Sequence, residues 1–255
     1  MRTKSLLILS LAALFCACEE RKGTVSEQEE PEWGKASVIV ENPIAPGDTL
    51  CYHIEFNLDT LSGESDLAKG LSQVLRDSII ASEGQPTVMQ AIAASIESLE
   101  AEWKEMLAEV YNEDDEYHGL LQYNYTLEGG PVETGNDDVL SYQTSFDMYL
   151  GGAHGMYAVG YYNFDKKTGK LINIRDIVPA DKEKAVLKAM IDQLIKDFDA
   201  ADEEDLKDNA GITMLGDVYL TSNFLLKKDS ILFLFNPYEI APFCCGAIDV
   251  TVPRP

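Results

Sequence analysis

The chain has 255 residues, 45% of them hydrophobic, which is enough for one sizeable domain or two small ones. Its 44 acidic residues outnumber its 20 basic residues, and the formal net charge is −24. So acidic a chain repels nucleic-acid phosphates and anionic lipid head groups, and neither is expected as a partner.

The N-terminus has the pattern of a bacterial lipoprotein signal. A short basic start leads into an apolar run, residues 5–15, which is too short to span a bilayer as a helix. The small residue Ala17 directly precedes Cys18, and four charged residues follow. We therefore expect residues 1–17 to be a signal peptide and Cys18 to carry the lipid. The alternative is an ordinary secretory signal that is cleaved near Ala17.

This reading places the protein in the cell envelope, anchored by lipid to the outer membrane, on its periplasmic or its surface face. Residues 18–35 are polar and acidic and lack hydrophobic periodicity, which predicts a flexible tether. Folded structure is expected to begin near Ala36, and no later apolar run approaches the roughly 20 residues of a spanning helix.

The remaining chain alternates between strand-like and helix-like patterns. In residues 86–111, apolar side chains recur in steps of three and four, as on one face of a helix. Helices are expected at residues 66–82, 86–111 and 181–198, and strands at 36–41, 50–58, 118–127, 139–150, 156–164, 171–174, 217–226, 230–235 and 247–252. These elements predict an α+β fold, a mostly antiparallel sheet with about three packed helices.

Two motifs in the last hundred residues carry a family resemblance. The first is Tyr149–Gly155 (YLGGAHG), which is followed by Asn163-Phe164-Asp165. The second is Phe235–Pro242 (FNPYEIAP), which precedes the strand-like residues 248–252. Together they resemble the extracytoplasmic domain of unknown function shared by RsiV anti-sigma factors and the non-catalytic region of PdaC peptidoglycan deacetylases. Residues 149–255 carry the likeness, and residues 36–148 resemble the companion region in layout.

The resemblance implies an α+β domain that works at the cell wall. RsiV-type ectodomains bind lysozyme, and PdaC-type proteins act on peptidoglycan. The 255 residues include neither the cytoplasmic sigma-binding segment of the first nor the deacetylase domain of the second. We therefore expect the module without either activity.

His154 is the first candidate for a binding residue. The flanking glycines allow unusual backbone angles and close approach of a ligand, so an imidazole presented there could bind or catalyse. The alternative is a bulge or tight turn in which His154 makes a structural hydrogen bond. Tyr157, Tyr161 and Tyr162 could extend a binding surface beside it, although tyrosines on strands are also common in cores.

Catalytic motifs are not found in the sequence. It contains neither the Gly-x-Ser-x-Gly turn of serine hydrolases nor the His-Glu-x-x-His motif of zinc hydrolases. The acidic runs at 113–116 and 202–205 lack the alternating ligands of a calcium loop, which favours solvated surface. We expect no metal, no cofactor and no enzymatic activity.

Three cysteines follow the signal region, namely Cys51, Cys244 and Cys245. Export would permit a disulfide from Cys51 to one of the adjacent pair. The alternative is that all three are buried thiols that pack as small apolar side chains.

These observations favour a lipid-anchored, non-catalytic binding module that recognises a wall-associated ligand, either a lysozyme-like muramidase or a peptidoglycan fragment. A wall-active hydrolase that uses unrecognised carboxylates and a purely structural lipoprotein are the alternatives.

Overall fold

The computed structural model describes residues 31–43, 51–110, 123–150 and 153–255. Within them lie five α-helices and eight strands, arranged as two sheets. The α+β class expected from the sequence is confirmed. Cys18, which we expect to carry the lipid, and the signal peptide expected before it lie outside the described residues.

The larger sheet has five strands in the order β1-β2-β3-β4-β5. The strands are β1 (Trp33–Pro43), β2 (Cys51–Leu61), β3 (Tyr123–Val132), β4 (Val139–Tyr149) and β5 (Met156–Asp165). All neighbours are antiparallel except β2 and β3, which run parallel. A parallel pair requires a crossover connection, and the first helices of the chain lie between these two strands in the sequence.

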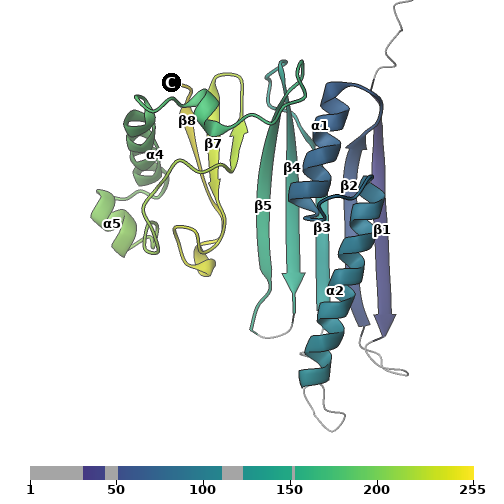
Figure 1. The fold of residues 1–255 in the computed structure, drawn as a ribbon. Helices are drawn as coiled ribbons and strands as arrows, with labels where there is room; N and C mark the ends of the chain where they lie inside the picture. The colour runs from purple at the N-terminus through teal and green to yellow at the C-terminus, as the bar shows by residue number, and fades with distance from the viewer. Residues whose placement is uncertain (1–30, 44–50, 111–122, 151–152) are drawn as a thin grey trace, which may run out of the picture.

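These helices cover one face of the larger sheet (Figure 1). They are α1 (Asp66–Val74), the π-helical turn η1 (Leu75–Ile79) and α2 (Val88–Val110). The Ser65 side chain caps α1 by accepting a hydrogen bond from the Ala68 amide at 3.1 Å. Phe56, Leu71 and Trp103 are buried between the helices and the sheet. Burial of each such side chain stabilises the fold by about 1.5–3 kcal/mol.

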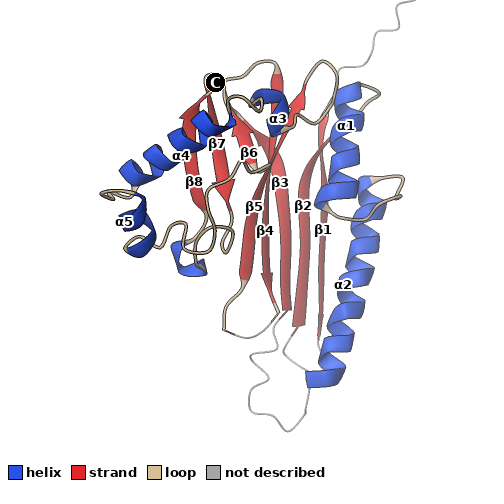
Figure 2. Ribbon diagram, turned by 60° about the vertical axis from the view of Figure 1, so that its left-hand side comes forward, coloured by secondary structure: helices blue, strands red, loops and turns tan. Residues whose placement is uncertain are grey.

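The smaller sheet lies beside β5 and has its own core (Figure 2). Its strands are β6 (Phe224–Leu226), β7 (Ser230–Phe235) and β8 (Ile248–Pro253), antiparallel in that order. The helix α4 (Glu183–Asp197) packs against it with Val186, Met190 and Leu194 buried. Short helices α3 (Ile174–Ile177), α5 (Glu203–Asp208) and η3 (Phe243–Cys245) connect the remaining segments.

Asparagine side chains join the two sheets along the edge of β5. Asn223 accepts from the Tyr161 amide at 2.9 Å and donates to the Val159 carbonyl at 2.8 Å. Asn236 also bonds Val159, accepting from its amide at 2.8 Å and donating to its carbonyl at 3.1 Å. The side-chain amides therefore take the place that the main chain of a sixth strand would occupy.

The third asparagine of this seam, Asn163, points from β5 into the interior and is 1% exposed. Its amide donates to the Phe224 carbonyl at 2.7 Å, and its Oδ1 accepts from the Leu226 amide at 3.0 Å. The Ser141 hydroxyl donates to the same Oδ1 at 2.8 Å. Both its side-chain amide and its Oδ1 thus bond backbone groups of β6 and hold this strand against the larger sheet.

The turn after β5 packs directly on the start of α1. Gly169 has φ +67°, and a Cβ on it would lie 2.0 Å from the carbonyl oxygen of Asp66. A Cβ on Gly70 of α1 would lie 1.9 Å from the Gly169 carbonyl oxygen. Backbone meets backbone here, and only glycine fits at either position.

Several boundaries differ from the expected ones. β1 begins at Trp33, inside the expected tether, because residues 33–35 pair with residues 59–61 of β2. The expected division between residues 148 and 149 falls at the end of β4, and β5 beyond it belongs to the same sheet. Of residues 217–226 only 224–226 form a strand. Just before it, the Thr221 amide donates to the Tyr219 carbonyl and the Asn223 amide donates to the Thr221 hydroxyl, and such local bonds compete with strand pairing. Residues 171–174 form a single bridge followed by α3.

Candidate functional site

The turn between β7 and η3 presents an aromatic side chain to solvent. Asn236, at its start, is fixed to β5, and the Glu239 amide donates to the Asn236 carbonyl at 3.1 Å. The Tyr238 amide donates to the Ala241 carbonyl at 3.0 Å. Tyr238 itself has φ +72°, a left-handed conformation that is rare and strained for a bulky residue, and its side chain is 54% exposed. Strain of this kind, about 1–3 kcal/mol, is concentrated at functional sites.

Four rings meet at this place, and we call them the aromatic surface: His154, Tyr157, Tyr238 and Phe243. The imidazole of His154 stacks on Phe243 with centroids 4.2 Å apart and planes 18° apart. Tyr157 meets Phe243 edge-on at 5.8 Å, and Tyr238 lies 5.8 Å from it on a tilted plane. Phe243 is thus the centre of the cluster, and the other three rings are exposed around it.

Hydrogen bonds orient the histidine within this cluster. Nδ1 of His154 lies 2.8 Å from the Gly155 carbonyl oxygen, which can only accept, so Nδ1 carries a proton. In the neutral imidazole Nε2 then accepts, and the Tyr238 hydroxyl lies 3.4 Å from it. The structural hydrogen bond considered as the alternative for His154 is therefore present. The same ring also contributes to an exposed surface.

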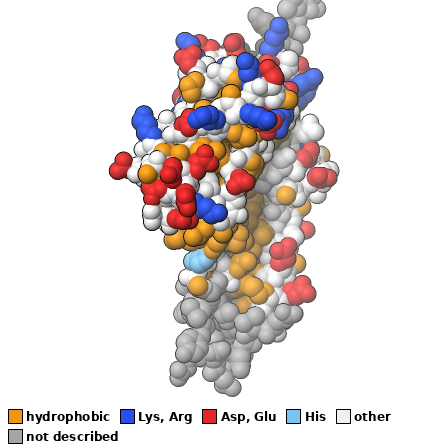
Figure 3. All heavy atoms as spheres, turned by 90° about the vertical axis from the view of Figure 1, so that its left-hand side faces the viewer, with side chains coloured by type: hydrophobic (Ala, Val, Ile, Leu, Met, Phe, Trp, Pro, Cys, Tyr) orange, Lys and Arg blue, Asp and Glu red, His pale blue; other side chains and the backbone are white. Residues whose placement is uncertain are grey.

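Carboxylates border the aromatic surface. Asp147 pairs with Tyr157 across β4 and β5, so the two side chains point to the same face. Glu239 directly follows Tyr238 and is exposed. Asp249 lies near Tyr161, and burial together with this carboxylate raises the pKa of the Tyr161 hydroxyl. Figure 3 shows hydrophobic side chains gathered beside a histidine on this face, with acidic side chains above and to the side.

The structure brings some of the expected binding residues together and separates others. His154 and Tyr157 share the aromatic surface, and Tyr161 lies four residues further along β5, on the same face of the strand as Tyr157. Tyr162 points to the opposite face, where it packs against the core under the helices. The structure therefore separates Tyr162 from the other three residues.

Two residues of the aromatic surface were not expected from the sequence. Tyr238 belongs to the Phe235–Pro242 motif, which carried the family resemblance, and Phe243 directly follows it. The only sequence signal for Tyr238 as a surface residue was its place directly after Asn236-Pro237, a pair that favours a turn.

Two adjacent cysteines, Cys244 and Cys245, directly follow Phe243 and form no disulfide. Cys244 is exposed and Cys245 half-buried, and both are free thiols within η3 rather than in a strand. The alternative of three buried thiols is therefore wrong for Cys244, and the side chain of Cys51, the other residue of the disulfide that we considered, lies outside the described residues. Burial first, and then the neighbouring Cys244, raises the pKa of the Cys245 thiol, which disfavours the reactive thiolate.

The acidic segment 202–205 has a structural role at the start of α5. The Asp202 side chain accepts a hydrogen bond from the Asp205 amide, as a helix cap does. The Asp205 carboxylate accepts from the Ala201 amide and from Asn209, and these bonds lower its pKa. The other acidic run, 113–116, lies outside the described residues. Among the described residues, no group of three or more His, Cys, Asp or Glu side chains could hold a metal ion.

The C-terminal third of the chain matches a known family. Residues 175–255 match the model of DUF3298, described as a protein of unknown function. The matched region contains α4, the smaller sheet and both Tyr238 and Phe243, whereas His154 and Tyr157 precede it. The expected domain of unknown function is confirmed to this extent, and its link to RsiV and PdaC stays a prediction.

Two crystal structures are similar to this chain. A DUF3298 family member from Bacteroides fragilis NCTC 9343 is 24% identical with a TM-score of 0.75, over 88% of this chain and 90% of that one. A DUF3298 family protein from Pseudomonas aeruginosa PAO1 is 15% identical with a TM-score of 0.59, over 89% of this chain and 92% of that one. At these identities the likeness shows a shared fold. No curated protein matches the chain. None of the described helices is both long and apolar enough to span a membrane.

Proposed function

We propose that this protein is a lipid-anchored, non-catalytic binding module of the cell envelope whose aromatic surface binds a basic, lysozyme-like muramidase. The observation that carries the proposal is the exposed cluster of His154, Tyr157 and Tyr238 around Phe243, bordered by carboxylates. Tyrosine and other aromatic side chains dominate the centres of protein interfaces, and charged groups occupy their rims.

The charge of the chain supports a basic partner. With a net charge of −24, the protein attracts cationic proteins over long distances and raises their rate of association. The rim residues Asp147 and Glu239 place part of this charge next to the rings. The anchored N-terminus would keep the module at the membrane, where it would meet muramidases that enter the envelope.

The test is binding of the full chain to hen-type lysozyme by biolayer interferometry, at about 0.1 M and about 1 M salt. The Debye length falls from about 10 Å to about 3 Å over this range, so non-specific attraction disappears. Binding that persists at high salt is the expected result. Loss of all binding at high salt would contradict the proposal.

Substitutions locate the interface. Tyr157→Ala and Tyr238→Ala should each weaken binding about 30-fold, which corresponds to a hot spot of about 2 kcal/mol. Trp33→Ala is the matched control, because Trp33 is also a large, 45%-exposed aromatic side chain but lies on β1, at the other edge of the sheet. Wild-type affinity in both tyrosine variants would exclude this surface.

Two further readouts separate the alternatives. Co-sedimentation with purified sacculi in place of lysozyme binding would indicate a peptidoglycan ligand, and release of soluble sugar or peptide from sacculi would indicate a hydrolase. The anchor is tested separately: Cys18→Ala should move the protein from the membrane fraction to the soluble fraction, and unchanged membrane association would contradict lipidation of Cys18.

A further inference from the structure

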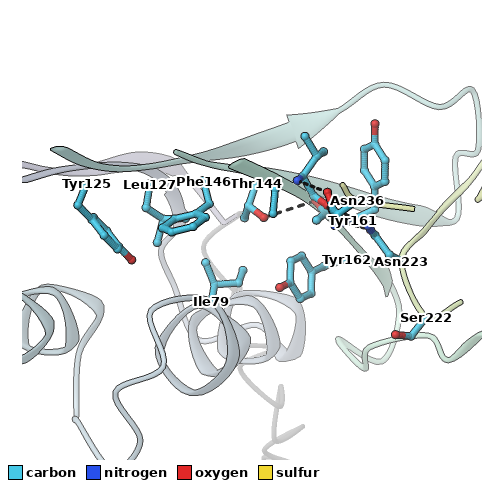
Figure 4. A pocket seen from close by; sticks show the side chains of 13 residues that line it. Ile79, Tyr125, Leu127, Thr144, Phe146, Tyr161, Tyr162, Ser222, Asn223 and Asn236 are labelled. Carbon is cyan, nitrogen blue, oxygen red and sulfur yellow. Dashed lines mark hydrogen bonds between the residues drawn. The ribbon is translucent and has the colours of Figure 1, made fainter. Parts of the chain in front are cut away.

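A groove lies on the opposite face of β5 from the aromatic surface. It has a volume of about 340 Å³ and lies over β3, β4 and β5 on the side of the helices. Ile79 of η1 forms one wall, and Ser222 and Asn223, just before β6, form the other. Figure 4 shows Tyr125, Phe146 and Tyr162 projecting from the sheet toward the side of Ile79, whereas Tyr161 points away.

The floor of this groove is flat because of one glycine. Gly160 of β5 faces the groove without a side chain, and a Cβ there would lie 2.8 Å from the Thr144 hydroxyl and 3.2 Å from a ring carbon of Tyr162. Its absence lets the Tyr162 ring lie along the strand, close to Thr144. Tyr125 and Phe146 continue the aromatic lining, with ring centroids 5.3 Å apart.

Some polar groups of the groove have hydrogen-bond partners within the protein and others do not. The side-chain amides of Asn223 and Asn236 are already hydrogen-bonded to the edge of β5. Among the described residues, no protein group hydrogen-bonds the hydroxyl of Tyr125 or of Tyr162, and the Thr144 hydroxyl has only a 3.5 Å contact with the Gly160 carbonyl. Burial raises the pKa of both tyrosines, so their hydroxyls remain protonated donors.

The wall opposite Asn223 has an irregular backbone. The α1 helix ends in the π-helical turn η1, of which Ile79 is the last residue, and Ala81 just beyond has φ +58°. Single π-helical turns and left-handed non-glycine residues both occur preferentially at functional sites. The groove is thus bordered by locally unfavourable backbone.

These features select one class of ligand. No lining residue carries a charge, which disfavours anions such as nucleotides as well as cations. An alkyl chain would leave the hydroxyls of Tyr125, Thr144 and Tyr162 without partners. A sugar ring presents an apolar face to aromatic side chains and hydroxyl groups at its edge, and the volume lies within the range of about 300–1,000 Å³ for small-ligand pockets.

We propose that this groove binds a small neutral saccharide, stacked on the rings of Tyr125, Phe146 and Tyr162 and hydrogen-bonded to the hydroxyls of Tyr125, Thr144 and Tyr162. The proposal does not rest on the proposed function, because the groove and the aromatic surface lie on opposite faces of β5 and share none of the four rings.

Titration of the ¹⁵N-labelled full chain with N,N′-diacetylchitobiose and with cellobiose tests this proposal by NMR. Saturable shifts at amides of β3–β5 are the expected result for at least one sugar, and stronger binding of chitobiose would indicate recognition of the acetamido groups. Tyr125→Phe and Tyr162→Phe keep the rings and remove one hydroxyl each. Each should weaken binding about 2- to 12-fold, the equivalent of one neutral hydrogen bond of about 0.5–1.5 kcal/mol.

Tyr161→Phe is the matched control. It removes the same hydroxyl from the neighbouring residue of the same strand, but on the opposite face, and should leave saccharide affinity unchanged. Absence of shifts with both sugars, or equal weakening in the Tyr161 and Tyr162 variants, would overturn the proposal. Tyr157→Ala, which tests the aromatic surface, should not change the titration, so failure at one site can be distinguished from failure at the other.

Discussion

Asn163→Ala should destabilise the protein more than any other single asparagine substitution on the larger sheet. The side chain is buried and makes three hydrogen bonds of 2.7–3.0 Å, two of them to backbone groups of β6. Alanine removes all three and leaves the Phe224 carbonyl and the Leu226 amide buried without these partners. Because each such orphaned group costs about 1–3 kcal/mol, the expected loss is about 3–5 kcal/mol.

The matched control is Asn57→Ala on β2 of the same sheet. The Oδ1 atom of Asn57 is buried but has no hydrogen-bond partner among the described residues, so its removal leaves no group orphaned. We expect a change below about 1 kcal/mol.

Thermal unfolding followed by circular dichroism measures both variants. For a chain of this size, 1 kcal/mol shifts Tm by about 2–4 °C, so Asn163→Ala should lower Tm by about 6–20 °C. A shift no larger than that of Asn57→Ala would refute the role assigned to the seam between the sheets.

Two further predictions concern stability. Burial, and then the charge of Glu102 and the presence of Tyr125, raise the pKa of Tyr123 to about 12. The unfolded chain therefore loses this proton first, and the free energy of unfolding should fall from about pH 10 to about pH 12, by at most about 1.4 kcal/mol per pH unit for this group. Tyr123→Phe should reduce this fall, as measured by denaturation at several pH values; an unchanged slope would contradict it. Gly169→Ala should cost more than about 3 kcal/mol in urea denaturation, because the new Cβ would lie 2.0 Å from a backbone oxygen. Gly135→Ala, also at positive φ (+70°) but in open space, should cost about 1–2 kcal/mol, and equal losses would refute the close contact.

The local patterns of hydrophobic residues predicted the long helix and most of the longer strands. The steps of three and four in residues 86–111 correspond to α2, and the strand expected at residues 156–164 corresponds to β5. Patterns of this kind report which face of an element is buried, so they fix its type and approximate length. They do not report which strand pairs with which, and the parallel pairing of β2 with β3 was not expected.

The candidate site was predicted less completely. Tyr161 and Tyr162 are adjacent on one strand and must point to opposite faces, so their grouping could have been rejected from the sequence alone. The left-handed backbone of Tyr238 could not have been foreseen, since local sequence favours other residues there. The bonds of Asn163 to β6 span 61 and 63 residues, and no local pattern identifies a partner so distant.

The seam of asparagine side chains has a consequence for the order of folding. The larger sheet is complete at residue 165, whereas Asn223 and Asn236 are synthesised later. Until they arrive, the edge of β5 presents the unpaired amide and carbonyl of Val159, and exposed edges of this kind template intermolecular pairing. We therefore expect aggregation of chains truncated before residue 223, and the C-terminal sheet acts for the rest of the protein as an intramolecular cover of that edge.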